Sequence, residues 1–388
     1  MCKIMISAGE ASGDLHGASL ATALKKICSN VRIFGMGGSK MREAGVEIVH
    51  DINDLATMGF IEIATSMPKL FRLRKFLSDV MDLERPDVLV IIDYPGFNMR
   101  LAKIAKAKGI PVVSYISPKV WAHGRGRAKE MANLVEHVAV IFPFEVEIYR
   151  EAGANVSFIG NPLIDIAKPT LTKEEAYRYF DADPIKPVVL LMPGSRRHEI
   201  QELLPVMMSA AEKITEKIPC QFYLPIAPTI AEETIANILK EYSVPVKLST
   251  SHTYDLMHIS DIAIAASGTA TLETSIMAVP TILIYKLNTI TYFIAKFMVD
   301  IPYVGLANII ADRLIIPELI QHNATPDNIV KEAVALLTNK ELRERILHDL
   351  DEVKSKLGEP GAVDRGAQII LDVACNKTGI SLSPNIES

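Results

Sequence analysis

Short apolar runs alternate with amphipathic stretches along most of this chain. In its first part the apolar runs are residues 3–7, 31–36, 88–93, 111–115, 137–142 and 156–159. Helical patterns lie between them, such as residues 14–27 and 98–108. Strands that are apolar throughout and are separated by helices predict a parallel sheet with both faces covered.

The alternation pauses at residues 161–186, where prolines cluster, and we interpret this stretch as a connector. Apolar runs then resume at 188–192, 221–225, 246–248, 262–266 and 281–285, and helical patterns follow at 326–337, 340–357 and 361–376. The sequence therefore predicts an α/β protein of the GT-B type, with two Rossmann-like, doubly wound domains facing an interdomain cleft. We expect the first domain at 1–165, the second at 166–360, a C-terminal helix at about 361–376 packed back on the first domain, and a loose tail at 378–388.

Composition narrows the functional classes. With 388 residues, of which 49% are hydrophobic and 22% charged, the chain can form two full-sized cores and is not disordered. A formal net charge of -5 argues against a general nucleic-acid binder. Four scattered cysteines without metal-type spacing favour a reduced, cytoplasmic compartment. No stretch reaches the roughly 18 apolar residues that span a bilayer, so any membrane contact is expected to be peripheral.

Two strand–turn–helix joints are the candidate site of the second domain. Residues 193–200 (PGSRRHEI) and 267–273 (SGTATLE) each follow an apolar run, and we place them two strands apart in one sheet. Such joints aim backbone N–H groups and a helix dipole at one point, which suits a diphosphate. Arg196 can add a charged contact, and Glu273 can accept a hydrogen bond from a ribose. The structural alternative is that Ser195 only caps a helix. Together the joints predict a nucleotide-sugar site.

Other phosphate and metal motifs are absent from the sequence. It contains no Walker-type loop and no Gly-x-Gly-x-x-Gly. The segment 181–183 (DAD) precedes a proline in the connector, and we interpret it as a turn. We therefore expect no metal and no cofactor, with helix ends and Arg196 stabilising the leaving diphosphate.

Carboxylates dominate the candidate site of the first domain. Residues 9–17 (GEASGDLHG) follow the first strand and bring Glu10, Asp14 and His16 into one turn, although Asp14 could instead cap the helix. Asp93 ends an apolar run at the carboxyl end of a strand, where a partly desolvated carboxylate can take a proton from a sugar hydroxyl. Its structural alternative is to cap a helix at Asn98.

Residues 66–81 combine an apolar stripe with cations. The stripe is typical of a helix face packed on a core, but one aromatic residue and several positive charges lie outside it. Residues 94–129 add eight Lys or Arg and no acidic residue. Core packing and a solvated basic face are the alternatives to a lipid-facing surface. The expected lipid contacts are Leu70, Phe71, Arg72 and Lys75, whereas the apolar segment 289–299 is expected to be buried between domains.

Several segments, in this order, resemble lipid-A-disaccharide synthases, a bacterial family of inverting GT-B glycosyltransferases. They are residues 7–14 (SAGEASGD), 93–98 (DYPGFN), 117–122 (SPKVWA), 193–196 (PGSR), 267–273 (SGTATLE) and 303–308 (YVGLAN). The resemblance implies transfer of a 2,3-diacylglucosamine unit from UDP-2,3-diacylglucosamine onto 2,3-diacylglucosamine 1-phosphate (lipid X). The product would be a β-1,6-linked disaccharide 1-phosphate, made at the cytoplasmic face of the inner membrane.

The resemblance also implies roles for single residues. Arg196 would contact the donor diphosphate and Glu273 the ribose, while Asp93 matches the proposed base. The remaining matches are Gly268, Thr269 and Ala270 along the phosphates, Asn308 at an essential site position, and Glu10 and Asp14 on the acceptor side. The departures from the family's pattern are His123, Asn161 and Ala307, which concern acyl-chain preference and hinge details.

Three alternatives stay open at this point. One is another GT-B enzyme, such as a UDP-sugar epimerase or a glycosyltransferase that acts on a different lipid. Another is a non-catalytic nucleotide-sugar or lipid-binding protein, which the intact Asp93 and Arg196 disfavour. The general base is Asp93, Glu10, Asp14 or His16, and the sequence leaves open whether the chain forms a homo-oligomer.

Overall fold

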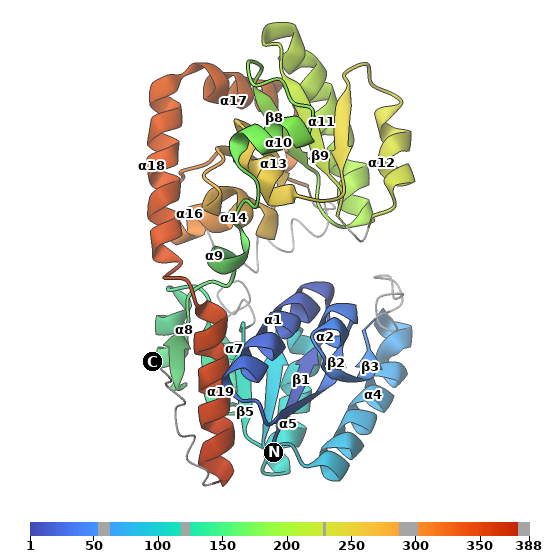
Figure 1. Ribbon diagram of the computed structural model, residues 1–388, viewed down its shortest axis with the longest axis vertical. Coiled ribbons are helices and arrows are strands. Elements are labelled where there is room, and N and C mark those ends of the chain that lie inside the picture. Colours follow the sequence, from blue (N-terminus) through green and yellow to red (C-terminus); the bar gives the residue numbers. More distant parts are fainter. Residues whose placement is uncertain (53–62, 118–124, 228–229, 287–301, 379–388) are drawn as a thin grey trace. The chain divides into compact units, whose positions relative to one another are not determined.

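The computed structural model describes residues 1–52, 63–117, 125–227, 230–286 and 302–378 (Figure 1). The chain divides into two compact units. One comprises Met1–Pro162 with Glu359–Ser388, and the other comprises Leu163–Gly358. The predicted segment 289–299, most of the motif 117–122 and the tail after residue 378 lie outside the described residues.

A parallel sheet in the order β3-β2-β1-β4-β5-β6-β7 forms the centre of the first unit (Figure 1). Its strands are β1 (Cys2–Ala8), β2 (Val31–Gly37), β3 (Glu47–Asp51), β4 (Val88–Ile92), β5 (Val112–Tyr115), β6 (His137–Val140) and β7 (Val156–Phe158). All residues of β4 and β5 are buried. Helices cover both faces of such a sheet, which is why its central strands are apolar throughout.

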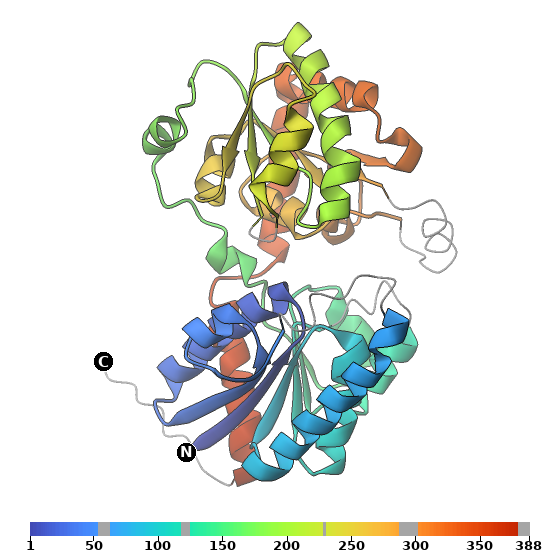
Figure 2. The ribbon, with the colours of Figure 1, turned by 90° about the vertical axis from the view of Figure 1, so that its right-hand side faces the viewer.

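The helices of the first unit lie on both faces of this sheet (Figure 2). They are α1 (Ala11–Ile27), α2 (Ser39–Glu43), α4 (Ile63–Glu84), α5 (Pro95–Ala107), α7 (Arg125–Ala132), α8 (Glu145–Glu151) and α19 (Ala362–Thr378). α1 packs against α19, whereas α4, α5, α7 and α8 contribute to one shared apolar core. Arg365 of α19 donates a hydrogen bond from Nε to the carbonyl of Ile159 (2.8 Å). The last described helix is therefore part of the first unit.

The second unit is built on a parallel sheet in the order β10-β9-β8-β11-β12-β13. Its strands are β8 (Val188–Met192), β9 (Gln221–Pro225), β10 (Val246–Ser249), β11 (Ile262–Ala266), β12 (Thr281–Tyr285) and β13 (Glu318–Ile320). Its helices are α9 (Leu163–Ile166), α10 (Lys173–Tyr179), α11 (Arg197–Lys217), α12 (Glu232–Leu239), α13 (Thr253–Ile259), α14 (Thr269–Ile276), α16 (Leu306–Ala311), the 3-10 helix η2 (Gln321–Asn323), α17 (Pro326–Thr338) and α18 (Lys340–Lys356). The predicted architecture of two Rossmann-like parallel sheets is confirmed.

Three local predictions need correction. β3 and β13 were not expected, because these sheet-edge strands are short and only half-buried and so lack an apolar run. The segment 161–186 is more than a connector, since it contains α9 and α10. Thr172 and Glu175 form a reciprocal capping box at the start of α10, and Ala176 and Phe180 pack into a core of the second unit.

Each sheet contains one point where the strand order reverses. In the first unit this switch point lies between β1 and β4, and in the second it lies between β8 and β11. Ligands of open α/β sheets bind outside the carboxyl ends of the strands at such points. No helix in the described part of the chain is both long and apolar enough to cross a membrane.

Candidate active site

The two joints of the second unit lie at its switch point. β8 and β11 are hydrogen-bonded parallel neighbours, with Leu191 opposite Ile264. The prediction that the joints are two strands apart was wrong, because β9 and β10 lie on the other side of β8. The segments that follow β8 and β11 therefore leave the same edge of the sheet side by side.

The joint after β11 has an open backbone. Gly268 has φ +152°, is the N-cap of α14, and has no atom within 4 Å of the place where a Cβ would stand. Thr269 is exposed and Ala270 half-buried at the start of this helix. An anion can approach the N–H groups of such a helix start closely.

The joint after β8 already holds a carboxylate. Glu199 Oε2 accepts hydrogen bonds from the backbone N–H groups of Ser195 (3.0 Å) and Arg196 (3.1 Å). Its Oε1 accepts one from Arg196 Nη1 (2.9 Å). The Arg196 side chain is 67% exposed and the Glu199 side chain 15% exposed. Glu199 was not among the predicted site residues, although a Glu three residues after a helix cap is a known capping signal.

Glu273 is held by a tyrosine. Tyr254 of α13 donates a hydrogen bond from its hydroxyl to Glu273 Oε1 (2.8 Å). Burial raises the pKa of the Glu273 carboxyl, and the Tyr254 hydrogen bond partly offsets that shift. The same pairing and burial raise the pKa of the Tyr254 hydroxyl. The bond fixes one carboxylate oxygen, so the side chain is oriented before a ligand arrives.

Asn308 is a buried residue of α16 whose side chain is fully hydrogen-bonded within the protein. Its Oδ1 accepts from the N–H groups of Ile315 (2.8 Å) and Ile316 (3.0 Å), and its Nδ2 donates to Ile316 O (3.0 Å) and Glu318 Oε1 (2.7 Å). Glu318 also accepts from the N–H groups of Val304 and Gly305. The geometry therefore gives Asn308 a positioning role. Glu318 was not predicted from the sequence, because its strand has only three residues and gives no apolar run.

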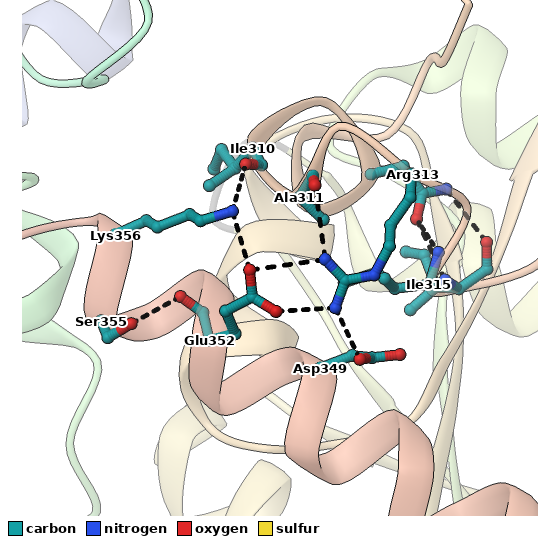
Figure 3. A network of polar contacts seen from close by, with 10 residues as sticks. Ile310, Ala311, Arg313, Ile315, Asp349, Glu352, Ser355 and Lys356 are labelled. Atoms are coloured by element: carbon teal, nitrogen blue, oxygen red, sulfur yellow. Dashed lines mark hydrogen bonds and ion pairs between the residues drawn. The ribbon is translucent and has the colours of Figure 1, made fainter.

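Ion pairs join the end of α16 to α18 (Figure 3). Arg313 Nη2 lies 2.7 Å from Asp349 Oδ1 and 2.7 Å from Glu352 Oε2. Lys356 contacts Glu352 Oε1 at 2.8 Å and Ile310 O at 3.5 Å. Hydrogen bonds from Arg313 and Lys356 lower the pKa of Glu352 to about 2. The segment that carries Asn308 is thus tied to a long helix.

In the first unit, Asp93 stands on a strained backbone at the switch point. Asp93 (φ +41°) and Tyr94 (φ +51°) both adopt the left-handed region, which is uncommon for residues other than glycine and less favourable for Tyr than for Asp. Asn98 Nδ2 donates to the carbonyls of Ser7, Ile92 and Asp93 and so holds the turn in place. Strain of about 1–3 kcal/mol persists only where neighbours enforce it, which is common at active sites. Helix α5 begins at Pro95 with Tyr94 as its N-cap, so Asp93 does not cap a helix at Asn98.

Glu10 lies near the Asp93 turn. A Cβ on Gly9 would stand 2.2 Å from Cδ1 of Tyr94, so the tyrosine ring packs directly on the Gly9 backbone. Burial and the Glu10 charge raise the pKa of Tyr94. β1 and β4 are parallel neighbours, so the loops that follow them bring Glu10 and Asp93 to one edge of the sheet.

Asp14 and His16 have different surroundings. Asp14 is buried and does not cap its own helix; its carboxylate accepts from the N–H groups of Gly38 (2.7 Å), Lys40 (3.0 Å) and Met41 (3.1 Å). It therefore fixes the start of α2. Burial lowers the pKa of His16 to about 4, and its Nδ1 has no partner among the described residues. A neutral imidazole of this kind is a weak base at pH 7.

The segment 181–183 forms a turn. Asp181 pairs with Lys247, and Asp183 Oδ1 accepts from the N–H of Ile185 (3.0 Å). Within the described residues no group of three His, Cys, Asp or Glu side chains is placed to hold a metal ion.

Comparisons with known proteins identify the family of this chain. The family model described as lipid-A-disaccharide synthetase matches residues 4–373. The chain is 42% identical to the lipid-A-disaccharide synthase of Syntrophus aciditrophicus over 370 residues, covering 95% of this chain and 97% of that one. It is 42% identical to the enzyme of the same name from Geobacter sulfurreducens over 372 residues, covering 96% and 97%.

Solved structures share the fold at low identity. The UDP-GlcNAc 2-epimerase of Neisseria meningitidis, bound to UDP-GlcNAc, aligns with a TM-score of 0.67 and 15% identity over 95% of this chain and 100% of that one. MurG of Acinetobacter baumannii aligns with a TM-score of 0.60 and 14% identity over 96% and 100%.

Proposed function

The chain belongs to the lipid-A-disaccharide synthetase family and is a glycosyltransferase, and from this premise we propose how its residues carry out the reaction. The enzyme condenses UDP-2,3-diacylglucosamine with lipid X and releases UDP. The second unit holds the donor and the first unit supplies the groups for the acceptor. The observation that supports this assignment is that the strands preceding most of the candidate residues, β1 and β4 in one unit and β8 and β11 in the other, are neighbours at the switch point of their sheet.

On the donor side, the diphosphate lies at the open start of α14, along Gly268, Thr269 and Ala270. Arg196 and the Ser195 turn face it from the neighbouring strand end, and Glu273 accepts a hydrogen bond from the ribose. As the anomeric bond breaks, negative charge grows on the diphosphate. Preorganised N–H groups and a guanidinium stabilise that charge without rearranging.

On the acceptor side, Asp93 removes the proton from the 6-hydroxyl of lipid X. The oxygen then attacks the anomeric carbon of the donor sugar, the bond to UDP breaks, and the configuration inverts. Asp14 is not assigned as the base, because three backbone N–H groups occupy its carboxylate oxygens and hold it against the start of α2. Glu10 is exposed and remains the second candidate base.

We also propose that α4 contacts the inner membrane on its cytoplasmic side. Leu73 and Leu77 are buried and Leu70 packs partly against the same core. Phe71 is 58% exposed, and the guanidinium of Arg74 lies 4.2 Å from the centre of its ring. Arg72 and Lys75 are exposed beside it. Exposed aromatics among cations suit a lipid interface with anionic headgroups.

The direct test is to incubate the protein with UDP-2,3-diacylglucosamine and lipid X and to determine the mass of the product. The proposal expects a disaccharide 1-phosphate and one UDP per turnover. UDP-GlcNAc offered alone should stay unchanged, whereas an epimerase would convert it.

Arg196→Ala should slow turnover, because the loss of a charged contact raises the activation barrier by about 2 kcal/mol or more. Unchanged kinetics in this variant would remove Arg196 from the site.

A further inference from the structure

The turn between β8 and α11 is occupied by a carboxylate of the protein itself, that of Glu199. The Glu199 carboxylate receives hydrogen bonds from two backbone N–H groups and one guanidinium, those of Ser195 and Arg196. Strand–turn–helix joints offer this same set of donors to phosphate oxygens. The carboxylate thus engages the donors that the proposed function gives to the donor's diphosphate.

The turn is shaped around that carboxylate. Gly194 has φ +113°, and a Cβ there would stand 2.3 Å from Glu199 Oε2. The residue must therefore be glycine both for its backbone conformation and for the close approach of an oxygen. Close approach of an anion to a glycine backbone is what phosphate loops require as well.

The end of β12 also lies within electrostatic reach of Glu199 and Arg196. Burial and the Glu199 charge raise the pKa of Tyr285, at the end of β12, whereas Arg196 lowers it. β11 lies between β8 and β12, so the Glu199–Arg196 pair borders the open joint at Gly268. A diphosphate at that joint and a carboxylate beside it repel each other.

We propose that the Glu199 carboxylate competes with the donor's diphosphate for Arg196 and the Ser195 turn, and so determines how tightly the enzyme holds UDP. This inference rests on the proposed function. Donor binding displaces the carboxylate, and its return to the turn weakens the grip on the UDP product. Product release limits the turnover of many enzymes, so such competition favours turnover over tight binding.

The test compares ligand binding by the full-length protein and its variants in calorimetry. Glu199→Ala and Glu199→Gln should bind UDP at least fivefold more tightly than the wild type, and UDP should inhibit turnover at correspondingly lower concentration. The affinity for uridine, which has no phosphate, should not change. Glu202→Gln is the matched control, because Glu202 is exposed on the same helix and its loss changes the net charge equally. In an Arg196→Ala background the gain should be lost.

The competing interpretation is a permanent helix cap, since Glu199 accepts from the backbone N–H of the N-cap residue Arg196, as the Glu of a capping box does. A cap predicts that Glu199→Ala binds UDP no better than the wild type, and that result would overturn the proposal. Gln serves the capping box as Glu does, so Glu199→Gln decides the matter if the alanine variant unfolds. A wild type that binds no UDP would instead refute the donor site itself.

Discussion

Asp93 and Asp14 are both carboxylates of the first unit, but their hydrogen bonds separate their roles. Asp14 accepts three backbone N–H groups from a segment more than twenty residues away and organises the start of α2. Asp93 stands on a strained turn that Asn98 holds at the carboxyl end of β4. The strain gives Asp93 the position expected of a reacting group.

Replacing Asp93 by Asn should abolish the chemical step without affecting donor binding. A general base contributes about 10²–10⁴ in rate, so we expect kcat to fall by at least 100-fold. The Kd for UDP should stay nearly unchanged, because the proposed donor site lies in the second unit. Rapid-quench single turnovers would measure the step, with Glu10→Gln as the parallel variant. A near-normal rate in Asp93→Asn and a large loss in Glu10→Gln would transfer the role to Glu10.

Glu273 is expected to make stability depend on pH. Burial raises its pKa in the folded protein, so the ionised form costs stability as pH rises through that folded value. Below 4.5, the ordinary pKa of a Glu side chain, both the folded and the unfolded state are protonated and this cost is absent. Glu273→Gln should therefore melt at a higher temperature than the wild type at pH 7.5, with a smaller difference near pH 4.5, while its affinity for UDP falls.

Thermal melts at both pH values measure this effect, and Glu202→Gln controls for the change in net charge. A lower melting temperature for Glu273→Gln at pH 7.5 would mean that the hydrogen bond from Tyr254 outweighs the cost of burial.

At the level of elements, α16 is held by two kinds of contact that should differ in strength. Asn308 is buried, and its removal leaves the N–H groups of Ile315 and Ile316 without a partner, which costs about 1–3 kcal/mol for each buried group. It also takes one donor away from Glu318, which keeps its bonds to the N–H groups of Val304 and Gly305. Arg313 makes solvent-exposed ion pairs (Figure 3), which water and salt screen.

Asn308→Ala should consequently lower the free energy of unfolding clearly more than Arg313→Ala. Denaturant titration followed by circular dichroism provides the comparison. Equal losses in the two variants would show that the buried network relaxes after truncation and that Asn308 does not organise the segment.

Helix α4 presents its own testable surface. Exchanging Phe71, Arg72 and Lys75 for Ser removes exposed side chains only, so folding should be preserved. Co-sedimentation with vesicles of anionic lipid in low salt should fall several-fold, because both the aromatic insertion and the charge attraction are lost. Leu83→Ser is the control, since Leu83 is 81% exposed near the other end of the same helix. Equal pelleting of all proteins would contradict a membrane-facing α4.

For the whole molecule, the chain returns to its first unit after completing the second. Gly366 of α19 packs so closely on Tyr115 that a Cβ would stand 2.5 Å from the ring. Gly366→Ala should therefore destabilise the first unit by about 1–3 kcal/mol through overpacking. Hydrogen exchange would locate the loss in the first unit, and UDP binding by the second should persist.

Gly126→Ala is the matched control, because nothing lies within 4 Å of its added Cβ. If Gly366→Ala lost hydrogen-exchange protection evenly in both units, the two units would not be independent in stability.

Much of this architecture follows from local patterns. The apolar runs at 188–192, 221–225, 262–266 and 281–285 match the observed strands to the residue, because the middle residues of these strands are buried on both faces and are apolar. The same reasoning misses β3 and β13, whose residues are only half-buried. It also misses α10, which is short and follows a proline-rich stretch.

Chain order alone thus establishes two α/β units, their strand–turn–helix joints and the residue types proposed to face a nucleotide, since strand, turn and helix signals arise between neighbours along the chain. Only the folded units decide that β8 lies beside β11, that Glu199 fills its own turn, and that Asp14 and Asn308 support the backbone. The physical reason is that a hydrogen bond depends on where its partner lies in space. Strand order places segments side by side that lie far apart along the chain, and their spacing in the sequence does not reveal that they are neighbours.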